Sequence, residues 1–255
     1  MKIDAVILAG GGIEESLKEI SGAKSKGYIE IAGKMMIERA IDVLRDSSGI
    51  GRVVIAAEPE YMPQSVRDKA DFVVQPGSSI LASLESGIRG LKGGSDVVLV
   101  IPCDLPFLTV ESVNDFLDQY RKNPSDIAYA FLSRKNSESK YPDLEHTYVK
   151  LKDGEFCGTG FIIIKPEMID KCSEFMGKLT KNRKNPIALA SIFGLSFILK
   201  FLTRTLTVRD LEEKVSKISG MSARGIETRH AEAGFNIDKA SHYHEALRAV
   251  KGGSF

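Results

Sequence analysis

A short apolar run near the start of the chain, residues 4–9, ends in three consecutive glycines at positions 10–12. A nearly unbroken apolar run of this length is typical of a strand that is buried on both faces of a sheet. Three glycines directly after it favour a tight backbone turn, because glycine adopts conformations that other residues avoid. The segment therefore predicts a parallel sheet whose strands are covered by helices on both faces.

The alternation of strand and helix signals continues along the first half of the chain. The runs are strand-like at 52–57, 72–74 and 96–101, and apolar residues recur at helical spacing at 36–44 and 80–91. After residue 125, a strand at 127–132 and a hairpin through 148–164 add mixed-sheet character. This order predicts a doubly wound, mostly parallel α/β sheet with helices on both faces.

The segment at 166–225 breaks this alternation, because its apolar spacing is mainly helical. Thr207 and Asp210 form a capping-box pattern for a helix that we expect to end at Gly220. Residues 171–225 carry 11 Lys and Arg against 4 Asp and Glu, a local net charge of +7, whereas the whole chain carries +1. We expect one domain over residues 1–255, with a mainly helical insert at about 170–225.

Two interpretations of the positive charge on this insert stay open. It is either a solvated helical face or a surface that meets an anionic acceptor. On the second interpretation, we expect acceptor contacts from Lys181, Arg183 and Lys184, which precede an expected loop-to-helix boundary. The apolar stretch 193–206, which carries only two cations, predicts a buried amphipathic helix, with a lipid-contacting helix as the alternative.

Composition and charge exclude several classes of protein. A net charge of +1 excludes a uniformly basic nucleic-acid-binding coat, so we expect no nucleic-acid partner. No apolar run reaches the roughly 18–20 residues of a membrane span, so we expect no stable membrane insertion. Asp4 lies where a signal peptide needs an apolar core, which favours a cytoplasmic protein. Cys103, Cys157 and Cys172 complete no disulfide framework and no CxxC motif, so we expect free thiols.

Ligands of open parallel sheets bind beyond the carboxyl ends of the strands, and two segments there could carry chemistry. The backbone of residues 8–12 can offer several N–H groups to phosphate oxygens. It is neither a GxGxxG motif, because Ile13, Glu14 and Glu15 follow, nor a P-loop, because no Gly-Lys-Ser/Thr follows.

The second segment holds Asp104 between Pro102 and Pro106, directly after the run at 96–101. A rigid carboxylate at this place suits Mg²⁺, which prefers one or two carboxylates plus substrate phosphates. Asp104 could instead cap a helix that begins near Thr109. Residues 235–238 predict a short strand or strand end, and Asp238, its last residue, raises the same question.

Four motifs in order resemble the MobA-like nucleotidyltransferase family: residues 6–12 (VILAGGG), 26–34 (KGYIEIAGK), 102–109 (PCDLPFLT) and 236–238 (NID). The resemblance covers residues 1 to about 165 and 230 to 250. It implies a Rossmann-like, GT-A-like nucleotidyltransferase domain. It also implies Mg²⁺-dependent transfer of a nucleoside monophosphate from an NTP, GTP or CTP, with release of pyrophosphate. The acceptor would be a small phosphorylated or hydroxylated molecule such as a cofactor precursor.

The resemblance also implies roles for individual residues. Lys26 and Asp104 match catalytic positions, and Asp104 and Asp238 match positions that face the metal. The nucleotide-binding positions are matched by Leu8, Ala9, Gly10, Gly11, Gly12, Lys24, Lys26, Gln75, Gly77, Ser78 and Ser79. The acceptor side is matched by Gly158, Thr159 and Gly160. The chain departs from the family in lacking Arg-Met-Gly after the glycines, where Lys18 and Lys24 occur instead.

Two other classes of function remain as alternatives. A nucleotide-sugar-dependent glycosyltransferase would usually show Asp-x-Asp at its metal, whereas this chain has Asp104-Leu105-Pro106. A catalytically silent nucleotide-binding regulatory domain would have no need of Lys26, Asp104 and Asp238 together. His242 and His244 lie two apart on an expected helix and point in different directions, so we expect surface histidines rather than a metal pair.

Overall fold

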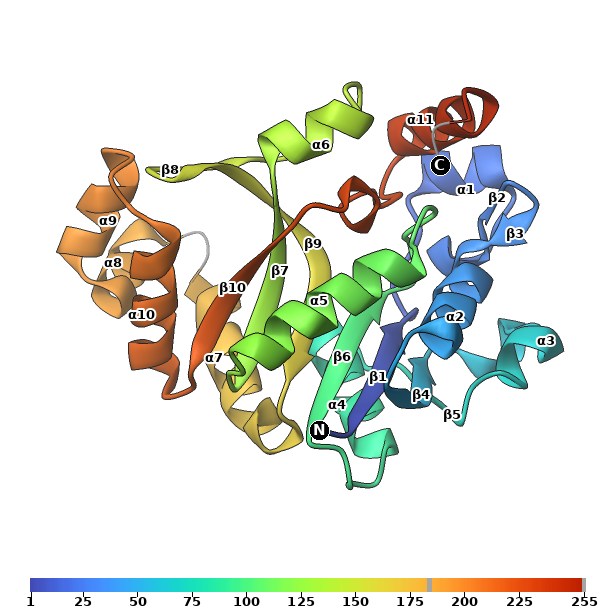
Figure 1. Cartoon of the computed structure of the whole chain (residues 1–255), viewed down its shortest axis with the longest axis horizontal. Helices are drawn as coiled ribbons and strands as arrows, with labels where there is room; N and C mark the ends of the chain where they lie inside the picture. The colour runs from blue at the N-terminus through green and yellow to red at the C-terminus, as the bar shows by residue number, and fades with distance from the viewer. Residues whose placement is uncertain (183–184, 254–255) are drawn as a thin grey trace.

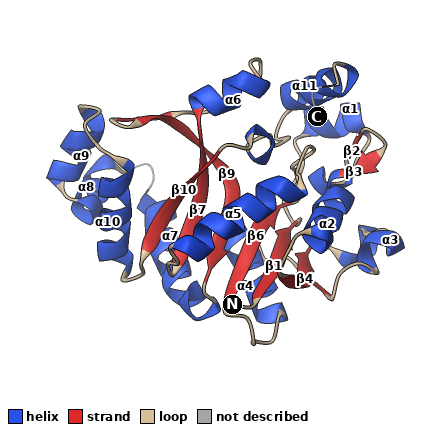
Figure 2. Ribbon diagram, viewed as in Figure 1, coloured by secondary structure: helices blue, strands red, loops and turns tan. Residues whose placement is uncertain are grey.

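The computed structural model describes residues 1–182 and 185–253, and its centre is one eight-stranded sheet (Figures 1 and 2). The strand order is β10-β7-β9-β6-β1-β4-β5, with β8 paired to β9. All neighbouring strands in this sheet pair in parallel, except that β9 runs antiparallel to β6, β7 and β8. The predicted mostly parallel α/β sheet is therefore confirmed. The strands are β1 (Ile3–Leu8), β4 (Ile50–Ala56), β5 (Phe72–Val74), β6 (Val97–Pro102), β7 (Ile127–Ser133), β8 (Val149–Leu151), β9 (Gly154–Ile164) and β10 (Ala223–Thr228).

Helices cover both faces of this sheet and bury its apolar side chains. On one face, α2 (Met36–Asp46) and α5 (Val110–Lys122) pack on the central strands through residues such as Ile37, Ile41 and Phe116. On the other, α4 (Ile80–Gly90) and α7 (Ile169–Asn182) pack through Leu84, Ile88 and Cys172. Figure 1 shows α2 and α5 in front of the sheet and α4 behind it. The core is thus two apolar layers separated by the sheet.

A third apolar cluster lies beyond the carboxyl ends of the central strands. It joins α1 (Glu15–Ser21) to α11 (Ala240–Lys251), and its centre is three aromatic rings. Phe235 meets Phe107 and Tyr141 edge to face, with ring centroids 4.9 and 4.8 Å apart. The cluster holds the last part of the chain against the first. The smaller elements are η1 (Lys26–Tyr28), β2 (Glu30–Ile31), β3 (Lys34–Met35), η2 (Pro59–Tyr61), α3 (Gln64–Arg67), α6 (Arg134–Lys140), η3 (Pro166–Met168) and η4 (Ala231–Ala233).

The segment after β9 is mainly helical, as its sequence predicts. Besides α7 it contains α8 (Pro186–Phe193), α9 (Leu195–Leu202) and α10 (Val208–Ser219). Thr207 and Asp210 form the expected capping box, and the helix ends at Gly220, which has φ 66°. The limits of the insert as a unit within the domain remain a prediction.

Three expectations for the second half of the chain were wrong. The stretch 193–206 is not one buried helix: it breaks at Gly194 (φ 84°), and α9 has no buried residue. Strand β10 begins at residue 223, inside the segment 166–225 that was expected to be mainly helical. The run at 235–238 is not a strand, because its backbone bonds to the loop after β6 rather than to the sheet. No helix among residues 1–182 and 185–253 is long and apolar enough to cross a membrane.

A buried ion pair links the first strand to its neighbour. Asp4 in β1 is fully buried, and its carboxylate accepts hydrogen bonds from the Arg52 backbone at 2.6 Å, the Arg52 guanidinium at 2.7 Å and the Ser95 hydroxyl at 2.5 Å. Burial alone would raise the pKa of Asp4, but the hydrogen bonds from Arg52 and Ser95 outweigh it and lower the pKa.

We expect Asp4→Ala to lower the free energy of unfolding by about 3 kcal/mol, because Arg52 loses its partner. The lowered pKa means that the unfolded state binds the proton more readily, so this stabilisation is present above the usual aspartate pKa and is lost as pH falls. Urea unfolding at about pH 7 and about pH 3 should show a smaller difference between variant and wild type in acid. An equal difference at both pH values would contradict the ion pair.

Candidate functional site

The carboxyl ends of four parallel strands lie side by side. The register pairs Leu8 at the end of β1 with Ala56 of β4 and Pro102 of β6, and Ala56 with Val74 of β5. The chain beyond these ends stays close, because Cys103 N donates to Leu8 O at 3.1 Å. The loops at 9–14, 75–79 and 103–106 therefore meet at one edge of the sheet, where ligands of such sheets bind.

The glycine loop contacts the 75–79 loop directly. A Cβ placed on Gly10 would overlap the Pro76 ring, so the two loops approach as closely as they do only because residue 10 is glycine. Gly11 and Gly12 are exposed, and a Cβ on either would meet nothing within 4 Å. Their backbone is therefore open to a ligand.

The predicted nucleotide-binding residues at 75–79 directly precede α4. Ser79 is its N-cap and accepts a hydrogen bond from Ala82 N at 3.2 Å, and Gly77 N donates to Ser83 Oγ at 3.0 Å. Gln75 and Ser78 are exposed beside them. The structure thus brings Gln75, Gly77, Ser78 and Ser79 to the same edge as the glycines, with one of them engaged as a helix cap.

Lys26, Asp104 and Asp238 form one ion cluster at this edge. Lys26 Nζ donates to Asp238 Oδ1 and lies 3.6 Å from Asp104 Oδ2. Ile237 N donates to Asp104 O at 3.0 Å, which ties the segment before α11 to the loop after β6. Gly27, beside Lys26, lies close to the loop after β6, because a Cβ there would be 3.2 Å from Cys103 Sγ.

Burial and charge determine the protonation of this cluster. Asp104 is only 9% exposed, and burial raises its pKa although the charge on Lys26 lowers it. Burial by itself would lower the pKa of Lys26, but the hydrogen bond to Asp238 and the charge on Asp104 outweigh it and raise the pKa. Lys26 is therefore held as an ammonium ion between two carboxyl groups.

The two carboxylates of the cluster fit a divalent metal ion whose other ligands come from the substrate. Asp104 Oδ1 is buried and has no hydrogen-bond partner among the described residues, which is costly for a polar atom unless a ligand completes it. Within residues 1–182 and 185–253, no group of three or more His, Cys, Asp or Glu side chains could hold a metal. Two carboxylates are the protein donors that Mg²⁺ needs when phosphates and water supply the rest.

The predicted acceptor-side residues lie on β9 next to the end of β6. Gly160 has φ 84°, and a Cβ there would lie 3.0 Å from Pro102 Cγ, two residues before Asp104. Thr159 is 4% exposed, and its hydroxyl donates to Ala130 O at 3.1 Å, so its side chain supports the sheet. Gly158 is exposed and accommodates the Tyr129 hydroxyl. An acceptor at this place would meet the glycine backbone rather than the Thr159 side chain.

The predicted lysines outside the cluster have different positions. Lys24 is exposed in the loop between α1 and η1. Lys181 is exposed near the end of α7, whereas Arg183 and Lys184 lie outside the described residues.

Two polar residues at this edge were not expected to belong to it. His242 is 8% exposed, so its expected surface position was wrong, and its Nδ1 accepts from Asp238 N at 3.4 Å. Asn236 donates through Nδ2 to Asp238 Oδ2. The signal was present in the i, i+4 spacing of Asp238 and His242 across a helix start, but this spacing does not predict that His242 is buried.

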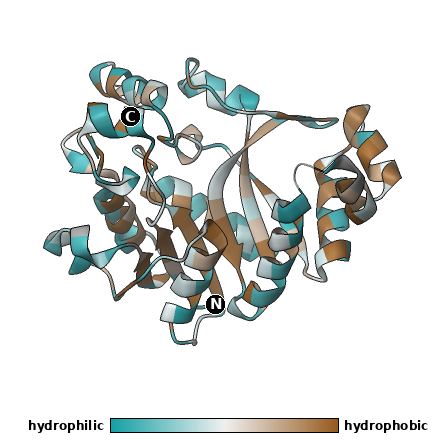
Figure 3. Ribbon diagram, turned by 180° about the vertical axis from the view of Figure 1, so that it is seen from behind, coloured by the Kyte–Doolittle hydropathy of each residue, from teal (hydrophilic) through white to brown (hydrophobic). Residues whose placement is uncertain are grey.

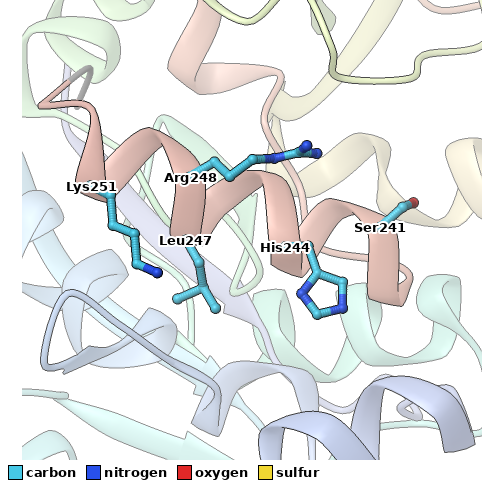
Figure 4. Close-up of a pocket in the computed structure, with 5 residues that line it drawn as sticks. All are labelled: Ser241, His244, Leu247, Arg248 and Lys251. Atoms are coloured by element: carbon cyan, nitrogen blue, oxygen red, sulfur yellow. The ribbon is translucent and has the colours of Figure 1, made fainter.

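The surface of the described residues also has hollows outside the ion cluster. One of about 510 Å³ follows one face of α11 and is lined by Ser241, His244, Leu247, Arg248 and Lys251 (Figure 4). It contains none of the predicted site residues. The ion cluster is instead defined by hydrogen bonds and charge at the strand ends.

Comparison with known proteins identifies relatives of this arrangement. A model of the MobA-like NTP transferase domain matches residues 5–178. The molybdenum cofactor guanylyltransferase of Shewanella sediminis is 26% identical over 185 residues, 69% of this chain and 76% of that protein. A structure of a hypothetical transferase from Thermus thermophilus is 26% identical with a TM-score of 0.80, covering 95% of this chain and 99% of that one. CMP:2-keto-3-deoxy-manno-octonic acid synthetase complexed with CTP shares the fold, with 14% identity, a TM-score of 0.64 and 100% coverage of both chains.

We expect Gly10→Ala to lower the free energy of unfolding by about 1–3 kcal/mol, because the new methyl group forces the glycine loop away from Pro76. Gly11→Ala is the matched control, since its methyl group meets nothing within 4 Å. Urea unfolding of the two variants measures the difference. Equal stabilities would mean that the two loops are not in contact in solution.

Proposed function

The chain belongs to the family of MobA-like NTP transferase domains and is a nucleotidyltransferase, and from this premise we propose its chemistry. It transfers a nucleoside monophosphate from an NTP to a small phosphorylated or hydroxylated acceptor, with Mg²⁺, and releases pyrophosphate. The observation that carries this proposal is the cluster in which Lys26 lies between Asp104 and Asp238 beside the glycine loop.

The glycine loop and Lys26 would bind the triphosphate. A triphosphate and an attacking oxyanion repel each other, so the catalyst needs cations and aligned N–H groups more than a nucleophile of its own. Gly11 and Gly12 have open backbone for such contacts. Lys26 is charged and is 21% exposed, so phosphate oxygens can reach its ammonium group.

Asp104 and Asp238 would hold Mg²⁺. When bound, Mg²⁺ neutralises charge on the phosphate oxygens and aligns the reacting groups. The bound cation would also satisfy the unpartnered Oδ1 of Asp104 and leave the ammonium of Lys26 free to bind phosphate. An acceptor phosphate is already ionised at neutral pH, so no general base is required of the protein.

We propose GTP or CTP as the nucleotide. Curated relatives are named molybdenum cofactor guanylyltransferases, and structures that share the fold are named for CMP or cytidylyl transfer. The base would lie at the exposed Gln75 and Ser78, beside the start of α4. The acceptor would lie at Gly158 and Gly160 on β9, and a cofactor precursor such as that of the guanylyltransferases is the first candidate.

We expect GTP or CTP with Mg²⁺ to raise the thermal midpoint more than the other two NTPs do, because a ligand at a hundred times its Kd stabilises by about 2.7 kcal/mol. Asp104→Asn should remove the Mg²⁺-dependent part of the shift, leave the unliganded midpoint unchanged, and lower pyrophosphate release at least about a hundredfold. Asp143→Asn, at an exposed loop position, is the control.

Two results would contradict this assignment. Turnover of Asp104→Asn within about threefold of wild type would remove Asp104 from the mechanism. Release of a nucleoside diphosphate from a nucleotide sugar, without pyrophosphate, would instead favour a glycosyltransferase.

We expect Lys26→Ala to weaken NTP binding and slow transfer by about ten- to a hundredfold, and Lys24→Ala to change both by less than about threefold. Lys26 is held in the ion cluster, whereas Lys24 is on the exposed loop before η1. Titration calorimetry with the preferred NTP separates binding from turnover. A larger loss in Lys24→Ala would assign the triphosphate contact to the loop instead.

A further inference from the structure

Helices α8 and α9 form a short apolar hairpin at the outer edge of the molecule. Their sequences, PIALASIF and LSFILKFL, contain one charged residue, Lys200. Helix α8 packs against α7 and α10, and α9 packs against α8. Figure 3 shows both helices as largely hydrophobic ribbons at one end of the long axis. An apolar pair of helices in this position is unusual for a surface that faces only water.

The outer face of α9 is a stripe of leucines. Leu195, Leu199 and Leu202 recur at helical spacing and are 67%, 52% and 69% exposed. The inner face is apolar too, because Phe197 stacks on Phe193 of α8 with ring centroids 5.2 Å apart. The inner residues account for the packing of α9 on α8. The three leucines of the stripe stay exposed in the part of the chain that the structure describes.

Positive charge borders this stripe at both ends. Arg204 lies two residues beyond the end of α9. Lys214 of α10 lies near the start of α9, because a Cβ on Gly194 would be 3.6 Å from Lys214 Nζ. Neither cation has a carboxylate within 4.0 Å among residues 1–182 and 185–253, whereas Lys200 pairs with Asp210 at 2.8 Å. The segment 171–225 carries a net charge of +7 in all.

We propose that the α8–α9 hairpin docks the protein on an anionic lipid surface. Leucine side chains would enter the boundary of the acyl chains, while Arg204 and Lys214 would lie among anionic headgroups. No helix needs to span the bilayer for this contact. The attraction combines a few apolar side chains with charge, which makes it reversible.

The geometry favours lipid over a protein partner. A helix of eight residues is about 12 Å long, too short to supply the roughly 800 Å² per partner of a stable protein complex. A two-fold contact between copies would also bring the +7 segment of one chain against that of the other. A lipid surface needs no shape complementarity and carries the opposite charge.

Co-sedimentation of the full chain with vesicles tests the proposal. We expect binding to phosphatidylglycerol vesicles, little binding to phosphatidylcholine, and weaker binding as salt is raised. The double change Leu199→Ser and Leu202→Ser should lower partitioning roughly tenfold or more, because both side chains leave the acyl region. Ile20→Ser, at a 42% exposed position on α1, is the matched control and should bind as wild type.

A second variant separates charge from apolar contact and from folding. Arg204→Gln with Lys214→Gln should lower binding to phosphatidylglycerol while the thermal midpoint stays that of wild type. Three results would overturn the proposal: no sedimentation of wild type above that without vesicles, binding unchanged in the leucine variant, or binding equal on both lipids. A dimer in light scattering that the leucine changes dissociate, without vesicle binding, would assign the stripe to contact between copies.

Discussion

The ammonium group of Lys26 joins segments of the chain that are separated by 212 positions in sequence. It lies between Asp104, after the central strand β6, and Asp238, before the last helix. Asp104 is only 9% exposed and needs a neighbouring cation to remain charged, because burial of an unpaired charge is costly, whereas the Asp238 side chain is 49% exposed. The candidate site therefore exists only when the end of the chain has folded back over the sheet.

The parallel sheet is what makes this meeting possible. Leu8, Ala56 and Pro102 end neighbouring strands in register, so the loops that follow start from one line. Parallel strands must be joined by crossovers, and each crossover returns the chain to the opposite edge before the next strand begins. The loops at this edge therefore all follow the carboxyl ends of parallel strands, and this brings the glycine backbone, Asp104 and the 75–79 loop to one place.

Much of this arrangement could be predicted from sequence, and the exceptions have a common cause. Asp104 stands out because a buried strand and two prolines fix its place, and Lys26 because it keeps its spacing to Gly33. His242 and the stretch 193–206 were misjudged because burial depends on what covers a residue, and periodicity carries no information about that. His242 is 8% exposed although it lies on a helix with polar neighbours, whereas the apolar Leu199 is 52% exposed.

The distribution of charge connects the two ends of the molecule. Residues 171–225 carry +7 while the whole chain carries +1, so the other residues carry −6 and the two charges are segregated along the chain. On an anionic surface this segregation turns the insert toward the surface and the acidic remainder away from it. Strand β9, which carries Gly158 and Gly160, lies in the sheet between β6 and β10. The ion cluster is at the end of β6, and α10 of the insert packs beside β10. An acceptor held on β9 would thus lie between the surface and the nucleotide, while an NTP could enter from the side that faces solvent.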